Sequence, residues 1–343
     1  MKAYLTKLVI VAASTIVLLA IPAYAAEQKP ILKLEEAVQS AISSSNQAAI
    51  NSNQYEALKE QMKVSQGADY YQYQSIYLKK AKNEQQKQLL EDRITSDITS
   101  KYNAMIVLED EIEGMYKSIG ISVKELRQAE LKSQKGIMNP VLYESKKNEI
   151  ETLKTSIKAK EEELQNAKLY FKVLTGKDMA EYILEETISY EPFKIEGLVE
   201  GYINSKISTY LQYDKEIAKF EQDNIIKDGD PTPFYANYLN TKTAADTAVL
   251  QLDDKQITLK QTLINHYTSL LSLEDQISGL QLQLQVMDKT LRSAELKYQA
   301  GMISVLEYDK QQAKKQEIEL QLLKLKSSYG SLKDMIQKPW IAG

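Results

Sequence analysis

Cysteine is missing from this chain of 343 residues, and its only histidine is His266. A chain without thiols, and with one imidazole, lacks the usual ligands of structural zinc sites and iron–sulfur clusters. It also lacks a thiol nucleophile and disulfides. No nucleophile with a base partner is evident in the sequence, so we expect no metal, no cofactor and no enzyme activity.

Glycine and proline are scarce, with 12 and 7 residues. Both counts are about half the usual share, so tight turns are few and the structural elements must be long. This disfavours sandwiches and barrels of short strands. Phe and Trp number 4 and 1, whereas Tyr numbers 22. Apolar surface therefore comes as aliphatic stripes with polar-tipped rings, which favours a thin helical assembly.

Basic charge is not in excess either. The chain has 43 Lys and Arg against 47 Asp and Glu, a formal net charge of −4, and the signs alternate along the sequence. Nucleic-acid binding depends on a basic surface that neutralises phosphates. We expect no nucleic-acid partner.

The N-terminus has the features of a secretory signal peptide. Lys2 and Lys7 form a basic start, residues 8–21 are an apolar run, and Ala23–Ala25 have the small-x-small pattern of a cleavage site. The run is shorter than the ~20 residues that span a bilayer, although an uncleaved anchor helix is the alternative. We expect residues 1–25 to be a signal peptide and the protein to be exported across the cytoplasmic membrane.

Prolines and glycines divide the remaining chain into six predicted helices, because a proline inside a helix costs about 3 kcal/mol. Asn139 before Pro140 is typical of a helix start, and Ser304 with Glu307 has the spacing of a capping box. The predicted helices cover residues 34–66, 71–135, 139–174, 195–227, 236–300 and 304–337.

Heptad spacing in the fifth predicted helix indicates a coiled-coil seam. Its apolar residues recur every seven positions: Leu263, Leu270, Ile277, Leu284, Leu291 and Tyr298. His266 sits at one seam position, where we expect it to serve packing or register and not metal binding.

An internal repeat is the strongest pattern in the sequence. Adding 165 to the residue number aligns 102–143 with 267–308 without a gap, and 16 of the 42 positions are identical. Residues 34–42 resemble 195–203 at an offset of 161, which predicts four extra residues in the second half. We expect two helical repeats, 26–176 and 195–343, joined by a linker at 177–194.

Each repeat is predicted to contain a short, a long and a short helix. At 1.5 Å per residue the short helices of the first repeat measure about 50 and 54 Å and the long one about 97 Å. Two short helices end to end therefore match the long one. We expect an all-α fold of elongated antiparallel coiled-coil hairpins, forming a slab that closes with copies of itself into a tube.

This arrangement resembles the TolC family of outer membrane efflux proteins. Residues 32–41 resemble the family's opening helix, and residues 294–304 resemble its second hairpin turn, with 134–138 as the first-half version. The family inserts strand pairs at two places where this chain has only residues 67–70 and 228–233. A spanning strand needs about 9–11 residues, so we expect a shortened member without the β-barrel strands.

The resemblance implies a homotrimer that is a passive conduit for small molecules or proteins in a tripartite efflux or secretion system. Its partners would be an adaptor (membrane fusion) protein and a cytoplasmic-membrane pump such as an ABC transporter. Its location would be the cell envelope: the outer membrane or periplasm where the cell has one, otherwise the extracytoplasmic surface. The alternative is a structural or regulatory coiled-coil protein of the envelope without channel activity.

Apolar residues at the two glycine turns are the predicted adaptor-docking sites, with a hydrophobic cap of each hairpin as the alternative. The residues are Gly136, Ile137, Met138, Gly301, Met302 and Ile303. Some family members keep acids six and nine positions after the second glycine, where this chain has Glu307 and Lys310. Glu307 is thus the candidate acid of a tunnel mouth, and its place in the capping box is the alternative role.

Aromatic residues gather at the opposite end, where the family has its barrel. They are Tyr70, Tyr71, Tyr73, Tyr77, Phe234, Tyr235 and Tyr238. Tyrosine belts mark membrane edges, so we consider contact with lipid or cell wall, and packing of the tips against one another as the alternative. Glu109–Asp110 and Glu274–Asp275 are adjacent pairs that point about 100° apart on a helix, so we expect solvated faces and not carboxylate sites.

Overall fold

The structure, a computed structural model, describes residues 29–67, 69–137, 139–185, 188–225 and 235–341. The predicted signal peptide lies outside the described residues. The first part of the chain forms α2 (Leu34–Ser44), α3 (Asn46–Val64), α4 (Tyr70–Gln134) and α5 (Pro140–Thr175). The second part forms α6 (Val199–Asp223), α8 (Tyr235–Gln299) and α9 (Val305–Gln337). Short elements are β1 (Ile31–Leu32), β2 (Ile183–Leu184) and the 3-10 turns η1 (Ser65–Gly67) and η2 (Pro339–Ile341).

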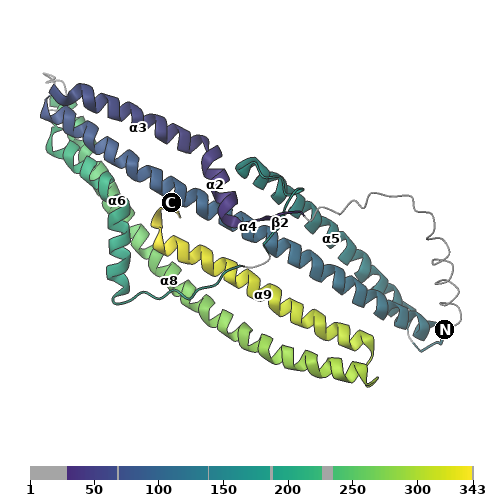
Figure 1. The fold of residues 1–343 in the computed structure, drawn as a ribbon. Coiled ribbons are helices and arrows are strands. Elements are labelled where there is room, and N and C mark those ends of the chain that lie inside the picture. Colours follow the sequence, from purple (N-terminus) through teal and green to yellow (C-terminus); the bar gives the residue numbers. More distant parts are fainter. Residues whose placement is uncertain (1–28, 68, 138, 186–187, 226–234, 342–343) are drawn as a thin grey trace, which may run out of the picture.

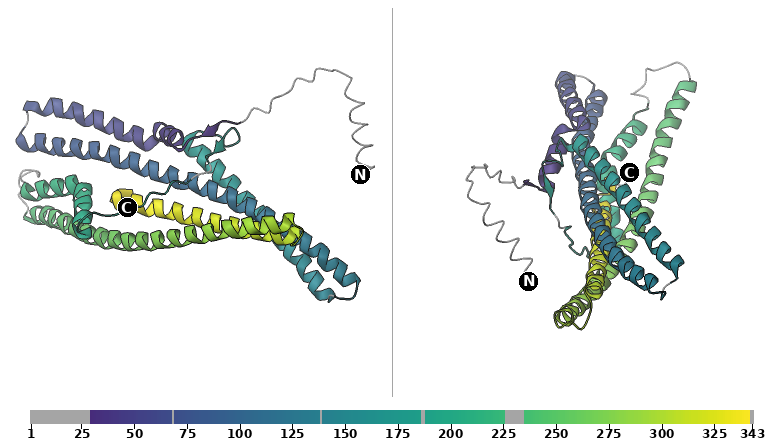
Figure 2. Two further views of the ribbon diagram at one scale, coloured as in Figure 1. Left: turned by 60° about the horizontal axis from the view of Figure 1, so that its bottom comes forward. Right: turned by 90° about the vertical axis from the view of Figure 1, so that its right-hand side faces the viewer.

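The helices form an elongated body with its long axis along α4 and α8, as Figures 1 and 2 show. Helix α3 packs along the first part of α4 and α5 along its second part, while α6 and α9 pack in the same way on α8. Contacts of α9 and α6 with α4 join the two sets. The predicted all-α fold of long antiparallel hairpins is confirmed. Within the described ranges, no helix is both long enough and apolar enough to cross a membrane.

Corresponding helices begin at a constant separation in the two parts of the chain. The starts at residues 34 and 199, 70 and 235, and 140 and 305 all differ by 165 (199 − 34, 235 − 70, 305 − 140). The predicted offset of 161, with a helix start at 195, is therefore wrong. Gly197 has a φ of +83°, a left-handed conformation that a helix excludes, so α6 starts only after Leu198.

The predicted helix 34–66 is broken into α2 and α3 at Ser45. Its backbone is extended, with φ −72° and ψ 115°, and its hydroxyl accepts a hydrogen bond from the Ala48 N–H at 3.3 Å. The Ser44 hydroxyl donates to the Leu174 carbonyl at 3.1 Å, which ties this bend to the end of α5. Serine side chains compete for backbone hydrogen bonds in this way, and they favour a cap over a helix interior.

A parallel pair of two-residue strands was not predicted. Ile31 pairs with Ile183 and Leu32 with Leu184, so the start of the described chain lies beside the segment that follows α5. The Tyr102 hydroxyl on α4 donates to the Leu32 carbonyl at 2.6 Å and accepts from the Glu185 N–H at 2.8 Å. One buried side chain thus holds both strands.

Tyrosines also anchor the extended segment before α6. Tyr267 on α8, which is 165 residues after Tyr102, accepts from the Ile195 N–H at 3.5 Å, and Tyr329 on α9 accepts from the Phe193 N–H at 2.6 Å. The two long helices therefore use equivalent tyrosines to hold the extended backbone that leads into the first helix of each part.

The C-terminal turn η2 crosses between the two parts of the chain. Trp340 is buried in a cluster with Ile203, Ile207 and Leu263 of α6 and α8, while its indole N–H donates to the Asp92 carboxylate of α4 at 3.0 Å. Asp92 also pairs with Lys338 at 2.9 Å. This contact fastens the end of α9 to both α4 and α6.

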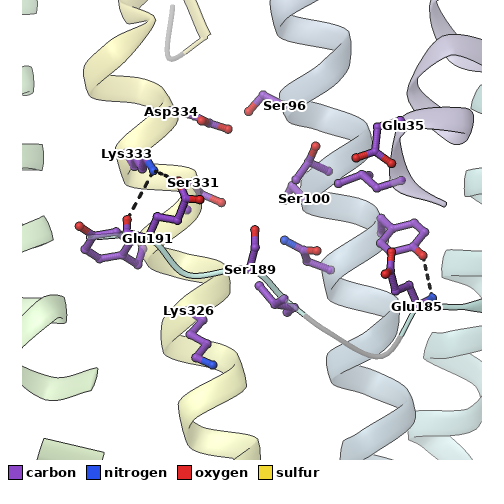
Figure 3. A pocket seen from close by; sticks show the side chains of 17 residues that line it. Glu35, Ser96, Ser100, Glu185, Ser189, Glu191, Lys326, Ser331, Lys333 and Asp334 are labelled. Atoms are coloured by element: carbon purple, nitrogen blue, oxygen red, sulfur yellow. Dashed lines mark hydrogen bonds and ion pairs between the residues drawn. The ribbon is translucent and has the colours of Figure 1, made fainter. Parts of the chain in front are cut away.

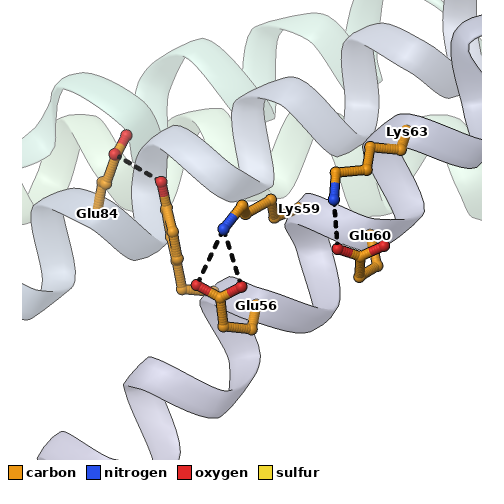
Figure 4. A network of polar contacts seen from close by, with 6 residues as sticks. Glu56, Lys59, Glu60, Lys63 and Glu84 are labelled. Atoms are coloured by element: carbon orange, nitrogen blue, oxygen red, sulfur yellow. Dashed lines mark hydrogen bonds and ion pairs between the residues drawn. The ribbon is translucent and has the colours of Figure 1, made fainter.

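Helix α3 is attached to α4 mainly by polar side chains. Asn51, its one buried residue, donates to the Asn83 carbonyl at 3.2 Å, and Tyr55 donates to Glu84 at 3.1 Å. Figure 4 shows Glu84 of α4 beside the exposed pairs of α3, Lys59–Glu56 and Lys63–Glu60. Exposed pairs of this kind contribute little to stability, so α3 is the helix least supported by an apolar core.

Candidate functional site

The two glycine turns have the same backbone geometry. Gly136 and Gly301 have φ of +68° and +69°, which a side chain would strain. Their N–H groups donate to Ser133 and Tyr298, and the N–H groups of Ile137 and Met302 donate to the carbonyls of the two lysines at 132 and 297, with all four distances between 2.8 and 2.9 Å. This is the Schellman pattern of helix termination.

Both turns place an apolar residue in solvent directly after the glycine. Ile137 and Met302 are each 73% exposed, whereas Ile303 is half-buried. Met138 lies outside the described residues. In the isolated chain the exposed pair is not packed onto the hairpin ends, which argues against a hydrophobic cap as their role. Figure 1 shows both turns at the same end of the body.

The residue three positions after each turn glycine caps the next helix. Asn139 accepts from the Val141 N–H at 2.9 Å. Ser304 accepts from the Glu307 N–H at 3.2 Å, and the Glu307 carboxylate accepts from the Ser304 N–H at 3.0 Å. Glu307 is exposed and completes this capping box. Its predicted place at a tunnel mouth stays a prediction.

An ion-pair clamp near the turns connects three helices. Glu125 of α4 binds Lys146 of α5 at 3.1 Å and also Lys310 of α9, and the neighbouring Lys124 pairs with Asp309. The hydrogen bond from Lys310 is the main reason that the pKa of Glu125 lies below its ordinary value of 4.5. Lys310 stands where some family members have an acid, and its partner on α4 was not evident from the sequence.

Acidification should release this clamp. Because the folded-state pKa of Glu125 is lowered, its carboxylate stabilises the fold above pH 4.5, and this contribution is lost as the pH falls from 4.5 through the folded-state pKa. The partners are partly exposed, so the contribution should stay below about 1 kcal/mol.

The measurement is the stability difference between wild type and Glu125→Gln across the acid range. The difference should shrink toward zero as the pH falls. Glu162→Gln, at an exposed pair 4.0 Å from Lys158, is the control and should show almost none at any pH. A difference for Glu125→Gln that does not depend on pH would contradict the clamp.

The opposite end carries the predicted tyrosines, in unequal environments. Tyr71 is buried and stacks on Phe220 of α6, with ring centroids 5.0 Å apart. Tyr70, Tyr77 and Tyr238 are exposed, and Tyr73 is half-buried. Tyr235 begins α8, its side chain is not described, and Phe234 lies outside the described residues. Packing of the tips thus accounts for Tyr71, while Tyr70 and Tyr77 keep exposed rings.

A polar pocket of about 340 Å³ lies between α4 and α9, where the segment after β2 crosses (Figure 3). Serines at 96, 100, 189 and 331 line it together with charged groups. Burial raises the pKa of Asp334 above its ordinary 3.8, and Lys333 is held by the Glu191 carbonyl at 3.4 Å. No imidazole is among the lining residues to activate a serine.

The remaining titratable candidates have structural surroundings. Burial lowers the pKa of His266 below 6.5, so its ring is neutral at pH 7. Glu109 pairs with Lys168 at 2.6 Å. We predicted a solvated face for Asp110, but its side chain is partly buried and faces Gln316 of α9. Burial raises the pKa of Asp110 above its ordinary 3.8. In the part of the chain that the structure describes, no three His, Cys, Asp or Glu side chains gather to hold a metal.

Comparison with known proteins places the fold. No family model and no curated protein matches the sequence. Among solved structures, CusC has a TM-score of 0.66 at 12% identity, covering 90% of this chain and 91% of its own. The outer membrane protein VceC from Vibrio cholerae has a TM-score of 0.61 at 13% identity, covering 90% and 96%. The CmeC outer membrane channel from Campylobacter jejuni has a TM-score of 0.56 at 12% identity, covering 90% and 86%.

These similarities extend over most of each chain and define the fold as that of TolC-family outer membrane channels. The predicted resemblance is therefore confirmed at the level of fold. Between α3 and α4 the described residues Ser65–Gly67 and Asp69 form a 3-10 turn and a helix cap, and the strands of the described chain are limited to β1 and β2. The second place named in the sequence, residues 228–233, lies outside the described residues.

Proposed function

We propose that this protein is a TolC-like conduit of an efflux or secretion system, exported to the cell envelope and without catalysis of its own. In this proposal three copies close into a tube, an adaptor docks on the glycine turns, and a cytoplasmic-membrane pump such as an ABC transporter supplies the energy. The conduit would carry small molecules or proteins.

The observation that carries the proposal is an exposed apolar stripe along the outer edge of α8. Its members are Leu250, Ile257, Leu271, Leu282, Val286 and Leu296, between 42% and 67% exposed. At 100° per residue they fall within about 80° of one another on the helix. The fully buried Leu263, Leu270 and Ile277 lie on the other side, against α6 and α9. A stripe of this length is typical of a surface that a partner covers.

The opposite edge of the body supplies a complementary surface. On α5, Leu169, Tyr170 and Val173 are exposed. Contact of the α8 edge of one copy with the α5 edge of the next is heterologous, and such contacts close into a ring when the rotation fits. This supports a closed tube and the homotrimer that the resemblance implies.

An internal duplication is part of the same proposal. Helices α4 and α8 both have 65 residues, and their ends are 165 residues apart. The shared turn geometry and the equivalent roles of Tyr102 and Tyr267 also support two repeats, 26–176 and 195–343, with 177–194 as the linker.

Oligomeric state tests the conduit. The mature protein should sediment at three times the monomer mass, and Leu250→Lys with Ile257→Lys should convert it to a monomer, because two charges cannot be buried at the interface. The matched control is Gln251→Lys with Thr258→Lys, one residue further along α8, which should stay trimeric. A wild-type monomer or dimer would favour the envelope scaffold without channel activity.

A further inference from the structure

The polar pocket of about 340 Å³ between α4 and α9 is built from four segments that are far apart in the sequence (Figure 3). They are the first turn of α2, the middle of α4, the segment after β2 and the second half of α9. The Tyr102 hydroxyl accepts from the Glu185 N–H at one side of the pocket. The Tyr329 hydroxyl accepts from the Phe193 N–H at the other side. The fold therefore holds the walls of the pocket in place.

Carboxylates outnumber lysines among the lining residues, by four to two. Glu191 and Lys333 pair with each other at 3.7 Å. The other three carboxylate side chains form no ion pair or hydrogen bond in the described ranges of the chain: Glu35, Glu185 and Asp334. Lys326 is the remaining cation of the lining. The pocket thus has an excess of two negative charges.

Asp334 is the half-buried carboxylate of this group. Burial raises its pKa above the ordinary 3.8. The nearest lysines along α9 are engaged elsewhere, Lys333 with Glu191 and Lys338 with Asp92 at 2.9 Å. An ammonium group in the pocket would supply the missing partner and favour the charged form of Asp334.

Gly330 leaves room for a bound molecule on the α9 side. Glycine in the interior of a helix is less stable than alanine. Apart from the helix's own turn, a Cβ at Gly330 would meet no atom of the described residues within 4 Å, so packing does not require a glycine there. Because Gly330 lines the pocket, its missing side chain opens the backbone of α9 to a ligand.

We propose that this pocket binds a small aliphatic diamine, a ligand whose two positive charges match the excess negative charge. Figure 3 shows Asp334 on the α9 side and Glu35 and Glu185 on the side of α2 and β2. The hydroxyls of Ser96 and Ser100 lie between them. One ammonium group therefore binds beside Asp334 and the other at the opposite side.

The separation of the carboxylates favours a diamine over a compact cation. In the parts of the chain with described structure, no three His, Cys, Asp or Glu side chains gather to hold a metal ion. Two ammonium groups joined by a flexible chain can reach separate carboxylates, and a neutral sugar would leave those charges unpaired.

A bound diamine would join α9 to the first turn of α2 and to the segment after β2. It would brace the region where the two parts of the chain meet, and it should stabilise the folded state by mass action. The inference does not rest on the proposed conduit, because one chain supplies the whole lining.

The test titrates diaminoalkanes, from diaminoethane to diaminooctane, into the mature wild-type protein by isothermal calorimetry at fixed salt, with butylamine as the monoamine. The best diamine should bind at least about tenfold more tightly than butylamine, because each added ion pair in a partly desolvated site strengthens binding. It should also raise the midpoint of thermal unfolding as its concentration increases.

Asp334→Asn tests the charge. It should weaken the best diamine about tenfold or more, whereas the thermal midpoint without ligand should not fall, since a half-buried carboxylate without a partner is removed. The control Asp275→Asn makes the same change in net charge at an exposed position of α8 and should leave the affinity unchanged.

Gly330→Leu tests the space. The leucine should raise the thermal midpoint, because it favours the helix, and should weaken the diamine about tenfold or more, because it fills the pocket. Gly279→Leu is the control on α8, where a Cβ also meets no described atom within 4 Å beyond its own helix. It should raise the midpoint without a change in affinity.

Three results would overturn the proposal: no diamine binds wild type, butylamine binds as tightly as every diamine, or the control variants lose as much affinity as the pocket variants. Magnesium or a neutral disaccharide that binds in place of diamines, with the same dependence on Asp334 and Gly330, would overturn it in favour of that ligand. A monomeric wild type that binds the diamine would remove the conduit and leave this site in place.

Discussion

Trp340→Ala should lower the free energy of unfolding by about 3–5 kcal/mol, the usual cost of truncating a buried aromatic side chain. Trp340 fills the cluster between α6 and α8 and is the chain's only tryptophan. Its indole N–H donates to Asp92, and its carbonyl accepts from the Arg93 side chain at 2.6 Å. The substitution removes the ring that links α9 to both α4 and α6, so these helices should separate more readily.

Denaturant unfolding followed by circular dichroism measures this loss. Trp340→Phe is the matched control, because it keeps a ring in the cluster and removes only the N–H donor, and it should cost about 1–3 kcal/mol. In the wild type, the fluorescence of Trp340 reports directly on the packing of η2. It should change before global unfolding if η2 detaches first. Equal stability of Trp340→Ala and wild type would show that Trp340 does not fasten the end of α9 to α4 and α6.

Ile137→Asp combined with Met302→Asp should abolish export while leaving the fold intact. Both side chains are 73% exposed, so each carboxylate remains solvated and stability should change by less than about 0.5 kcal/mol. At the proposed adaptor contact the same carboxylates would be buried without partners, which costs several kcal/mol per interface. Cells that make this variant should resemble cells without the protein.

Growth on a panel of toxic compounds, together with the profile of secreted proteins, measures this effect in the source cell. Leu198→Asp is the control because Leu198 is 84% exposed and lies away from the turns, directly before α6. Export that remains intact in the doubly substituted variant would show that the turns do not dock the adaptor. The single variants, Ile137→Asp and Met302→Asp, show which of the two turns contributes more to export.

Helix ends with local chemical signals were predictable to within a residue. Asn139 and Ser304 cap α5 and α9 through their own side chains, and Gly136 and Gly301 end α4 and α8 by adopting a positive φ. Each signal acts within a few residues of the chain, so it can be read without knowledge of the fold. The same reasoning located both exposed turn residues of the candidate site.

Contacts between distant segments were missed for the opposite reason. Helix 34–66 breaks at Ser45, where the bend is also tied to α5, and a single serine does not predict a break. The β1–β2 pair has two residues per strand, too few for any alternation to appear. Phe220 was not predicted among the aromatic residues at that end of the body. It stacks on Tyr71 only because α6 lies beside α4 there.

Composition, heptad spacing and turn chemistry by themselves determined that this chain forms long antiparallel helical hairpins with two exposed apolar turns. These properties depend on neighbours three to seven residues apart. The tertiary structure alone decided that Lys310 clamps Glu125 and that Trp340 closes the chain onto Asp92. Such pairings depend on which side chains meet across 185 or more residues, and only packing of the whole chain brings them together.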